Sequence, residues 1–292
     1  MKNAHLIDIS AVFFRYYFAP SPAIINDKGF DIAALLFSLR WLCKPEFFKD
    51  NITVACFDES LGSGFRHELD KDYKSNRALP SEDIIYQLMA LKVFCQYLGF
   101  AVLASKEVEA DDLIGAAAVK LKQYFCTIHS RDKDLRQLLN THVQMQDVMT
   151  DNIWNENSLL EETQLMPNQV ALYLALMGDN SDNIIGLPGI GDKTARALLV
   201  EYKTWEGIKA AVASGEKLPI RGSMRICNTI EEYQHLVDHN LQLTQLKTDV
   251  TVDLSSLPFN QKNFAMIEVL AHQFGIHSKL KKALSIANEN IA

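Results

Sequence analysis

The chain has 292 residues, of which 48% are hydrophobic and 22% charged, and its formal net charge is −7. This length can bury the core of one large domain, or of one domain with a smaller appendage. The apolar runs are too short and interrupted to span a bilayer, and the N-terminus lacks the pattern of a signal peptide. Five scattered cysteines form no C-x-x-C pair, so we expect a reduced, cytoplasmic protein without membrane association.

The first half of the chain alternates short apolar runs with helical patterns. The runs that predict strands are Ala4–Ile9, Asn51–Phe57, Ala101–Leu103, Tyr124–His129 and His142–Gln146. The patterns that predict helices are Ile32–Cys43, Ser81–Tyr97, Ala110–Lys122 and Asp134–Leu139. This alternation is typical of an α/β domain with a mainly parallel sheet flanked by helices, which we place at residues 1–165.

Beyond Pro167 the strand signal fades and helices dominate. The predicted helices are Asn168–Met177, Asp192–Tyr202 and Ile230–Leu243. A segment rich in glycine and turn residues, GDNSDNIIGLPGIGDKT, separates the first two. We therefore expect a second, helical region at residues 166–292, with a glycine-rich helix–turn–helix at 178–199.

Nine carboxylates stand where predicted strands end, where helices begin, or in turns. They are Asp8, Asp58, Glu109, Asp111, Asp112, Asp132, Asp134, Asp179 and Asp182. A single acid in such a position usually caps a helix or lies in a solvated turn. Because parallel strands end at one shared edge of the sheet, however, we expect these nine to converge there.

Crowded carboxylates repel one another unless a cation is bound between them. A set of oxygen ligands without cysteine or histidine favours Mg²⁺ or Mn²⁺ over zinc, and two such ions suit phosphodiester hydrolysis. The negative net charge argues at first against a nucleic-acid partner. Without the nine acids the rest of the chain would be slightly positive, so the total charge does not decide the matter.

Several motifs in series are similar to a known family. They are LIDIS (6–10), FDES (57–60), FRHELDKDYKSNRALPSED (65–83), VEADDLIG (108–115), SRDKDLRQLL (130–139), LMGDNSDNIIGLPGIGDKTA (176–195) and TQLKTDV (244–250). Together they resemble the 5′-nuclease domain of bacterial DNA polymerase I and its flap-endonuclease relatives, over roughly residues 3–255. The resemblance implies a PIN-like α/β fold and a stand-alone nuclease, because no polymerase domain follows.

The resemblance also implies roles for the nine acids. Asp8, Asp58, Glu109 and Asp111 would hold a first metal ion, and Asp132, Asp134 and Asp182 a second. Asp112 and Asp179 would be ligands or would support the ligands. The chain departs from the family at Ile9, where a glycine is usual after the first aspartate.

A basic stretch follows Phe65. It carries Arg66, Lys71, Tyr73, Lys74 and Arg77, and by itself it reads equally well as a solvated surface segment. By the resemblance it belongs to a helical arch at about residues 63–97, which admits a single DNA strand beside the metals. There Lys74 and Arg77 would be catalytic at the reacting phosphate, while Tyr73 would stack on an unpaired base.

The segment GLPGIGDKT is not a nucleotide-binding P-loop, because Asp192 separates Gly191 from Lys193 and no strand precedes it. It suits a helix–hairpin–helix that grips duplex phosphates. The expected DNA contacts are Gly189, Gly191, Lys193, Thr194 and Arg196. In relatives this loop binds potassium through backbone carbonyls, which would place Leu176, Met177, Ile185, Leu187 and Ile190 around a K⁺ ion.

These observations predict a monomeric 5′→3′ exonuclease or structure-specific flap endonuclease that acts on DNA with 5′ ends or 5′ flaps by a two-metal-ion mechanism. One alternative is a catalytically weak protein that binds branched DNA without cutting it. A second is a PIN-like ribonuclease, which also gathers acids on a parallel sheet. The glycine-rich loop and the length of the chain count against the ribonuclease.

Overall fold

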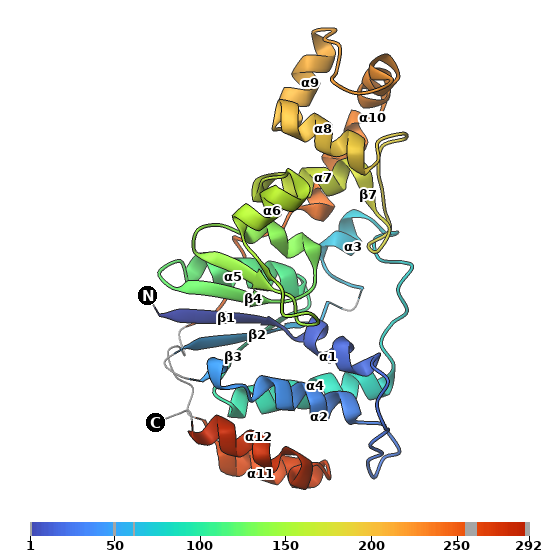
Figure 1. The fold of residues 1–292 in the computed structure, drawn as a ribbon. Coiled ribbons are helices and arrows are strands. Elements are labelled where there is room, and N and C mark those ends of the chain that lie inside the picture. Colours follow the sequence, from blue (N-terminus) through green and yellow to red (C-terminus); the bar gives the residue numbers. More distant parts are fainter. Residues whose placement is uncertain (1, 49–50, 61, 255–261, 290–292) are drawn as a thin grey trace.

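Six strands form one sheet, in the order β3-β2-β1-β4-β5-β6, in a computed structural model that describes residues 2–48, 51–60, 62–254 and 262–289 (Figure 1). The strands are β1 (Asn3–Asp8), β2 (Ile52–Asp58), β3 (Ala101–Ser105), β4 (Phe125–His129), β5 (Val143–Gln146) and β6 (Ile153–Trp154). The pairings among β1 to β5 are all parallel, and β6 pairs antiparallel with β5. Strand order reverses between β1 and β4, and ligands bind at such a switch point in open α/β sheets.

The sheet is buried on both faces because its strands carry apolar residues on both. Ile7 and Ala55 pack in the cluster formed with α1 (Ile9–Tyr17), α2 (Ala33–Leu42) and α4 (Glu82–Tyr97). Leu6 and Val54 pack on the opposite side, in the cluster that contains α5 (Ala110–Lys120). The predicted three-layer α/β arrangement is therefore confirmed.

A helical unit stands next to the α/β layer, on the side of the sheet that α5 covers (Figure 1). Its elements are α6 (Glu156–Thr163), η3 (Pro167–Gln169), α7 (Val170–Met177), the short hairpin β7 (Gly178–Asp179) and β8 (Ile184–Ile185), α8 (Asp192–Tyr202), α9 (Trp205–Ala213) and α10 (Ser223–Thr244). α7 to α10 share an apolar core of their own, which includes Leu176, Leu198, Trp205 and Ile230. None of the helices in the described part of the chain is long and apolar enough to cross a membrane.

The end of the chain returns to the α/β layer. Helices α11 (Phe264–Gln273) and α12 (His277–Glu289) pack against α4 and α2, on the side away from the helical unit (Figure 1). Ile267 and Leu280 are fully buried there. The expected helical region at 166–292, of which 255–261 and 290–292 lie outside the described residues, therefore has two parts in the structure, and the part formed by α11 and α12 packs on the α/β layer.

Two other local expectations need correction. The predicted helix Asp134–Leu139 is the 3₁₀ helix η2 (Lys133–Leu138), and Ile230–Leu243 is only part of the longer α10, which kinks at Tyr233. No helix was predicted over α1, although its buried residues Ile9, Val12 and Phe13 recur at the i, i+3, i+4 spacing of a helix. η1 (Pro45–Phe47) is a further short turn.

The predicted arch is much smaller than residues 63–97. Only α3 (Phe65–Leu69) and the irregular segment 70–80 lie beside the carboxyl edge of the sheet. Residues 82–97 are α4, whose Ile84, Leu91 and Phe94 are buried in the core. An apolar helix of this kind is held by the sheet, so it cannot belong to a free-standing arch.

A buried histidine pair gives the fold a pH dependence. His5 Nδ1 and His129 Nε2 lie 2.9 Å apart under Trp41 and Phe47. Burial lowers the pKa of His5 to about 4 and also lowers the pKa of His129. The folded state therefore binds fewer protons than the unfolded state between about pH 4 and the ordinary histidine pKa of 6.5.

We expect the free energy of unfolding to fall by about 2 kcal/mol through His5 alone as the pH is lowered from 7 to 5. Urea titrations at both pH values would measure this change. His5→Gln should reduce the difference between the two pH values, whereas the exposed-histidine control His142→Gln should retain it. An unchanged difference in His5→Gln would contradict the assignment.

Candidate active site

Strand ends deliver the first acids to the carboxyl edge of the sheet. β1 ends at Asp8, whose Oδ1 accepts a hydrogen bond from the Ala11 amide at 3.0 Å and so caps α1. The hydroxyl of Ser130, just after β4, donates to Asp8 Oδ2 at 2.7 Å. Asp58 ends β2 and accepts bonds from the amide and hydroxyl of Ser60. Ile9 begins α1 and is buried, so the site tolerates its side chain where the family usually has glycine.

The N-terminus of α5 supplies the next group. Glu109 is the N-cap of α5, and Asp111 lies in its first turn. Asp112 forms a capping box with Glu109, because its Oδ2 accepts the Glu109 amide at 3.2 Å. Four further acids complete the set. Asp132 and Asp134 follow β4, Asp179 ends β7, and Asp182 lies in the turn between β7 and β8.

Electrostatic interactions show which of these acids lie near one another. The pKa of Asp8 is raised to about 6, mainly by burial and to a smaller extent by the charges of Asp132 and Asp58. Burial and the charges of Asp132 and Asp8 raise the pKa of Asp111 well above its ordinary value. The pKa of Asp134 is raised by burial and then by Asp132 and Asp182. The structure thus gathers acids from β1, α5, the β4–η2 segment and the β7–β8 hairpin into one cluster.

Protein cations neutralise one side of this cluster. Lys74 Nζ lies 2.7 Å from Glu109 Oε1 and 3.6 Å from Asp182 Oδ2. Arg77 Nη2 lies 2.5 Å from Asp182 Oδ1, and Lys133 Nζ lies 3.0 Å from Asp179 Oδ2. Burial opposes ionisation of Asp179, but hydrogen bonds from Ser181 and Lys133 outweigh it and lower the pKa. The predicted catalytic residues Lys74 and Arg77 are therefore placed among the acids.

The segment that carries Lys74 is fastened to the β7–β8 turn. Lys74 has a left-handed backbone, with φ 53°, and its amide donates to the Asp182 carbonyl at 2.9 Å. The Asn183 side chain donates to the Asp72 carbonyl at 2.8 Å, and Asn76 donates to the Asn180 carbonyl at 2.8 Å. A non-glycine residue in this conformation costs energy, and these bonds hold it in place.

Arg66 needs a different role from the one predicted. It is 2% exposed, so it has no surface to offer DNA. Its guanidinium holds both oxygens of Asp112, at 2.7 and 2.9 Å, and reaches Glu109 at 3.3 Å. The Lys247 amide donates to Asp112 at 2.9 Å as well. Asp112 is thus engaged by protein donors on both oxygens, which favours the second of its two expected roles, that of a support for the ligands at the start of α5.

Tyr73 is also buried, at 3% exposure, so its ring has no free face for a base in this structure. Its hydroxyl lies 3.1 Å from Glu109 Oε2 and 3.0 Å from Asp182 Oδ2, between two acids of the cluster. The stacking role expected for Tyr73 is therefore corrected to one of positioning carboxylates. Lys71, by contrast, is exposed.

The donor set fits a hard divalent cation by its chemistry. It offers carboxylate oxygens, and the buried Asp134 Oδ1 has no hydrogen-bond partner among the described residues. Among the residues that the structure describes, no three histidine, cysteine, aspartate or glutamate side chains are already arranged as a metal-binding group. Lysine and arginine instead pair with Glu109, Asp179 and Asp182.

The glycine-rich segment forms a tight loop between α7 and α8. A side chain at Gly186 would meet the Met177 backbone at 2.2 Å, and Gly189 has φ +80°, so both positions require glycine. Gly191 is the N-cap of α8, and Lys193 in the first turn is exposed. Thr194 is half-buried. The loop therefore presents the free amides of a helix N-terminus beside one cation.

Arg196 does not reach this surface. Its Nε lies 2.5 Å from Asp192 Oδ1, its Nη1 donates to the Thr163 carbonyl, and its guanidinium lies over the Tyr173 ring. The carbonyl of Thr163 belongs to the end of α6, on the side of α8 that faces the rest of the protein. We therefore correct the expected DNA contact of Arg196 to a structural one.

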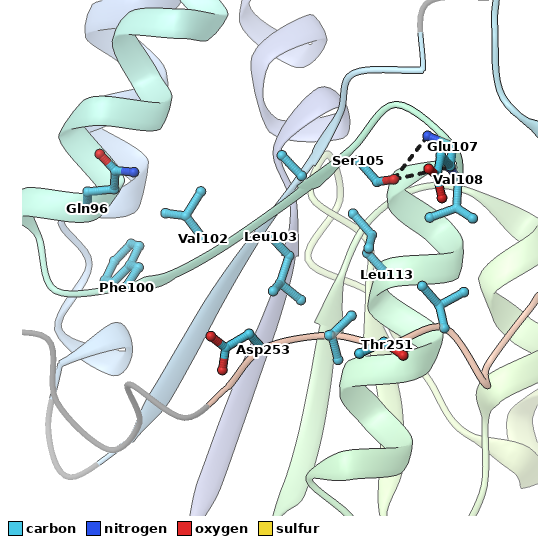
Figure 2. Close-up of a pocket in the computed structure, with 13 residues that line it drawn as sticks. Gln96, Phe100, Val102, Leu103, Ser105, Glu107, Val108, Leu113, Thr251 and Asp253 are labelled. Carbon is cyan, nitrogen blue, oxygen red and sulfur yellow. Dashed lines mark hydrogen bonds between the residues drawn. The ribbon is translucent and has the colours of Figure 1, made fainter.

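A separate hollow lies along the edge strand β3. Its volume is about 620 Å³, and Figure 2 shows Val102 and Ser105 of β3 lining it opposite Thr251 and Asp253. Ser105 Oγ accepts hydrogen bonds from the amides of Glu107 and Val108. None of the nine acids lines this hollow, so it is not part of the acid cluster.

Two family descriptions match this chain. Residues 3–164 match "5′-3′ exonuclease, N-terminal resolvase-like domain", and residues 165–265 match "5′-3′ exonuclease, C-terminal SAM fold". A 5′-3′ exonuclease of Buchnera aphidicola subsp. Baizongia pistaciae is 34% identical over 258 residues, which cover 87% of this chain and 84% of that protein. DNA polymerase I of Deinococcus radiodurans is 33% identical over 94% of this chain but only 28% of its own length.

The fold has solved counterparts. The flap endonuclease of bacteriophage T5, in a pseudo-enzyme-product complex with DNA and metal ions, superposes with a TM-score of 0.64 and 21% sequence identity. The match covers 98% of this chain and 100% of that one. This similarity confirms the predicted fold class.

Proposed function

The chain belongs to the 5′-3′ exonuclease family, and on that premise we propose that it is a nuclease that cuts DNA at or near a 5′ end with the aid of two divalent cations, Mg²⁺ or Mn²⁺. Nuclease activity as such follows from the family. The observation that carries the finer proposal is the cluster of buried acids, because Asp8, Asp111 and Asp134 all have raised pKa values in the absence of a cation. The energy of such a cluster is lowered when positive charge enters it.

We assign the acids to this task in two groups. Asp8, Asp58, Glu109 and Asp111 would hold one ion, and Asp132, Asp134, Asp179 and Asp182 the other. When bound, the ions would supply a deprotonated water and stabilise the oxygen that leaves. The chain's own hydrogen bonds orient the ligands, as Ser130 does for Asp8 and Tyr73 for Glu109 and Asp182.

Lys74 and Arg77 would face the reacting phosphate. In this structure Lys74 forms an ion pair with Glu109, and Arg77 forms one with Asp182. Once divalent cations neutralise these acids, the same two side chains become free to bind phosphate oxygens, where charge grows during hydrolysis. Lys71 lies on the exposed part of the same segment and would contact the strand outside the reaction centre. A free 5′ end or a 5′ flap can enter this site, because only the short segment 65–80 covers it.

The glycine-rich loop would anchor the duplex part of the substrate. The exposed Gly191 and Lys193, with Gly189 and Thr194, offer amides, a hydroxyl and one positive charge to the phosphate backbone. Such contacts do not depend on base sequence. We further propose that the protein works as a monomer, because its substrate surfaces lie on a single chain. Its free cysteines support the proposal that it works in the reducing cytoplasm.

We also propose a K⁺ ion at this loop. The carbonyls assigned to it belong to Leu176, Met177, Ile185, Leu187 and Ile190. Three of these carbonyls already accept a hydrogen bond. The Leu176 carbonyl accepts from the Leu187 amide, and the Leu187 carbonyl accepts from the Ile190 amide. The Ile185 carbonyl accepts from Asn240 Nδ2. A carbonyl oxygen has a second lone pair, which leaves it able to face a cation. Measuring DNA affinity in KCl and in an equal concentration of NaCl would test this ion.

One observation favours the alternative of a protein that binds branched DNA but cuts it poorly. The cations of Lys74, Arg77 and Lys133 occupy the acids and would have to withdraw before metal ions bind. If that exchange is costly, the site would load weakly. Tight binding of a 5′-flap DNA with negligible cleavage in a large excess of Mg²⁺ would select this alternative.

Removal of divalent cations tests the proposed function directly. We expect cleavage of a 5′-flap DNA to stop in EDTA and to return when Mg²⁺ or Mn²⁺ is added, because the site offers oxygen ligands and no side-chain nucleophile. Matched blunt duplex and RNA substrates in the same assay would report selectivity. Cleavage that continues at full rate after exhaustive chelation would exclude the metal mechanism.

A further inference from the structure

Loss of Arg196 as a DNA contact leaves the glycine-rich loop with a single nearby cation from its own sequence, Lys193. The Arg196 guanidinium is held by Asp192, Thr163 and the ring of Tyr173. Grip on a duplex comes mainly from neutralised phosphates, so one lysine beside a helix N-terminus is a weak anchor. The structure supplies a second charge from elsewhere in the chain.

The start of α10 returns to the loop. Ile226 is buried in the same apolar core as Ile190, and its Cδ1 would lie 3.8 Å from a Cβ at Gly189. The preceding residue, Arg225, is exposed, and its Nη2 would lie 3.9 Å from the same point. In Figure 1 the beginning of α10 lies in the same helical unit as α8 and α9, at the end away from the sheet.

Arg225 is available for a ligand. No hydrogen bond or ion pair of its guanidinium is present within the described parts of the chain, in contrast to Arg196. It ends the sequence KLPIRGSMR (217–225), which contains three cations and no acid. Gly222, with φ +76°, lets this segment turn into α10, so Arg225 lies in the first turns of that helix next to the loop.

We propose that Arg225 is a phosphate-binding residue of the duplex anchor and that it supplies the guanidinium that the loop sequence assigns to Arg196. Arg225 and Lys193 would hold DNA phosphates on either side of Gly189, where the absence of a side chain lets the backbone approach. The ligand is the phosphate backbone of a double helix. This inference rests on the proposed function, because it assumes that the loop binds duplex DNA.

Arg225→Ala should weaken binding of a 5′-flap duplex about tenfold in Ca²⁺, since a charge-assisted hydrogen bond is lost. The slope of log affinity against log salt should become shallower by roughly 0.9. Single-turnover cleavage in Mg²⁺ at saturating DNA should stay near the wild-type rate. Arg225→Lys should recover part of the affinity, because it restores the charge without the planar donor.

Two control variants sharpen the test. Lys122→Ala removes one exposed charge far from the loop, just beyond the end of α5, and should leave the affinity and the salt slope unchanged. Arg196→Ala should also keep the wild-type salt slope, because its charge is already paired. Melting temperatures of all variants would separate binding from folding effects.

The outcomes are distinct. Wild-type affinity and salt slope in Arg225→Ala would overturn the inference while leaving the proposed function intact. An equal loss in Lys122→Ala would overturn it too, since the effect would then reflect total charge alone. If the wild-type protein neither binds nor cuts flap DNA, the proposed function itself fails, and the inference fails with it.

Discussion

Replacing Lys74 with alanine should slow single-turnover cleavage at saturating DNA by on the order of 10²–10³, the typical cost of losing one donor that stabilises transition-state charge. Lys74 is only 14% exposed and lies between Glu109 and Asp182, so its charge is aimed into the acid cluster. The dissociation constant for DNA should change little, because the bulk of the binding energy comes from phosphates outside the reaction centre.

Lys74→Ala should also bind divalent cations more tightly in the absence of DNA. Its ammonium group competes with them for Glu109, and its removal leaves Oε1 of that carboxylate without this partner, while Arg66 and Tyr73 still hold Oε2. Calorimetric titration with Mn²⁺ would measure this effect independently of activity. The variant would then combine a loaded metal site with a slow reaction, which separates a role in chemistry from a role in holding the site together.

Lys193→Ala is the matched control, since it removes the same charge from the glycine-rich loop. It should weaken DNA binding and its salt dependence, yet cut at a nearly normal rate once DNA saturates. The reversed pattern, with a slow saturated rate for Lys193→Ala and only loose binding for Lys74→Ala, would show that the two regions have been assigned the wrong way round. If neither variant differed from the wild type, Lys74 would have no role in the reaction and Lys193 none in DNA binding.

Asp132→Asn and Asp182→Asn should each lower turnover at least about 100-fold while DNA affinity stays the same or rises. Each change removes a negative charge from a cluster that must accept both a cation and a phosphate. Asparagine keeps the shape of aspartate, and it is an equally good N-cap for Asp132 at the start of η2. The fold should therefore survive both substitutions.

Flap affinity in Ca²⁺ and cleavage in Mg²⁺ would be measured for each variant. Asp27→Asn is the control, because it removes one exposed acid from outside the cluster and should match the wild type in both assays. Asp182 has the additional partners Tyr73 and Arg77, so its variant should be checked by its melting temperature. Wild-type cleavage rates in both variants would exclude the second group of acids from the reaction.

The α/β core was predictable because its signals are local. Alternating apolar runs and helical patterns located β1 to β5, α2, α4 and α5 to within a few residues. α1 was missed although Ile9, Val12 and Phe13 have helical spacing, and the predicted strand Ala4–Ile9 had already taken in its first residue. The extent of the arch was overestimated for a related reason, since the contribution of α4 to the core is a fact of packing rather than of local pattern.

The positions of the acids could be read from the sequence, since Asp8 and Asp58 end strands, and Asp132 follows one, at a shared edge of the sheet. The partners of the acids could not. Arg66 reads as a surface residue in a charged stretch, yet it is buried against Asp112, a residue 46 positions away. The same holds for Tyr73, whose hydroxyl joins Glu109 and Asp182 from distant parts of the chain.

The sequence by itself determined the class of fold, the family and the edge at which the acids gather, because periodicity and motif order are properties of neighbouring residues. Only the tertiary structure decided which positively charged side chains are already paired with protein groups and which can bind DNA. Arg196 stands in the loop motif but is held by Asp192 and Thr163, while Arg225 lies outside the motif and comes to the loop through the packing of Ile226. The availability of a charge depends on the atoms that surround it in space, and chain order does not encode these contacts locally.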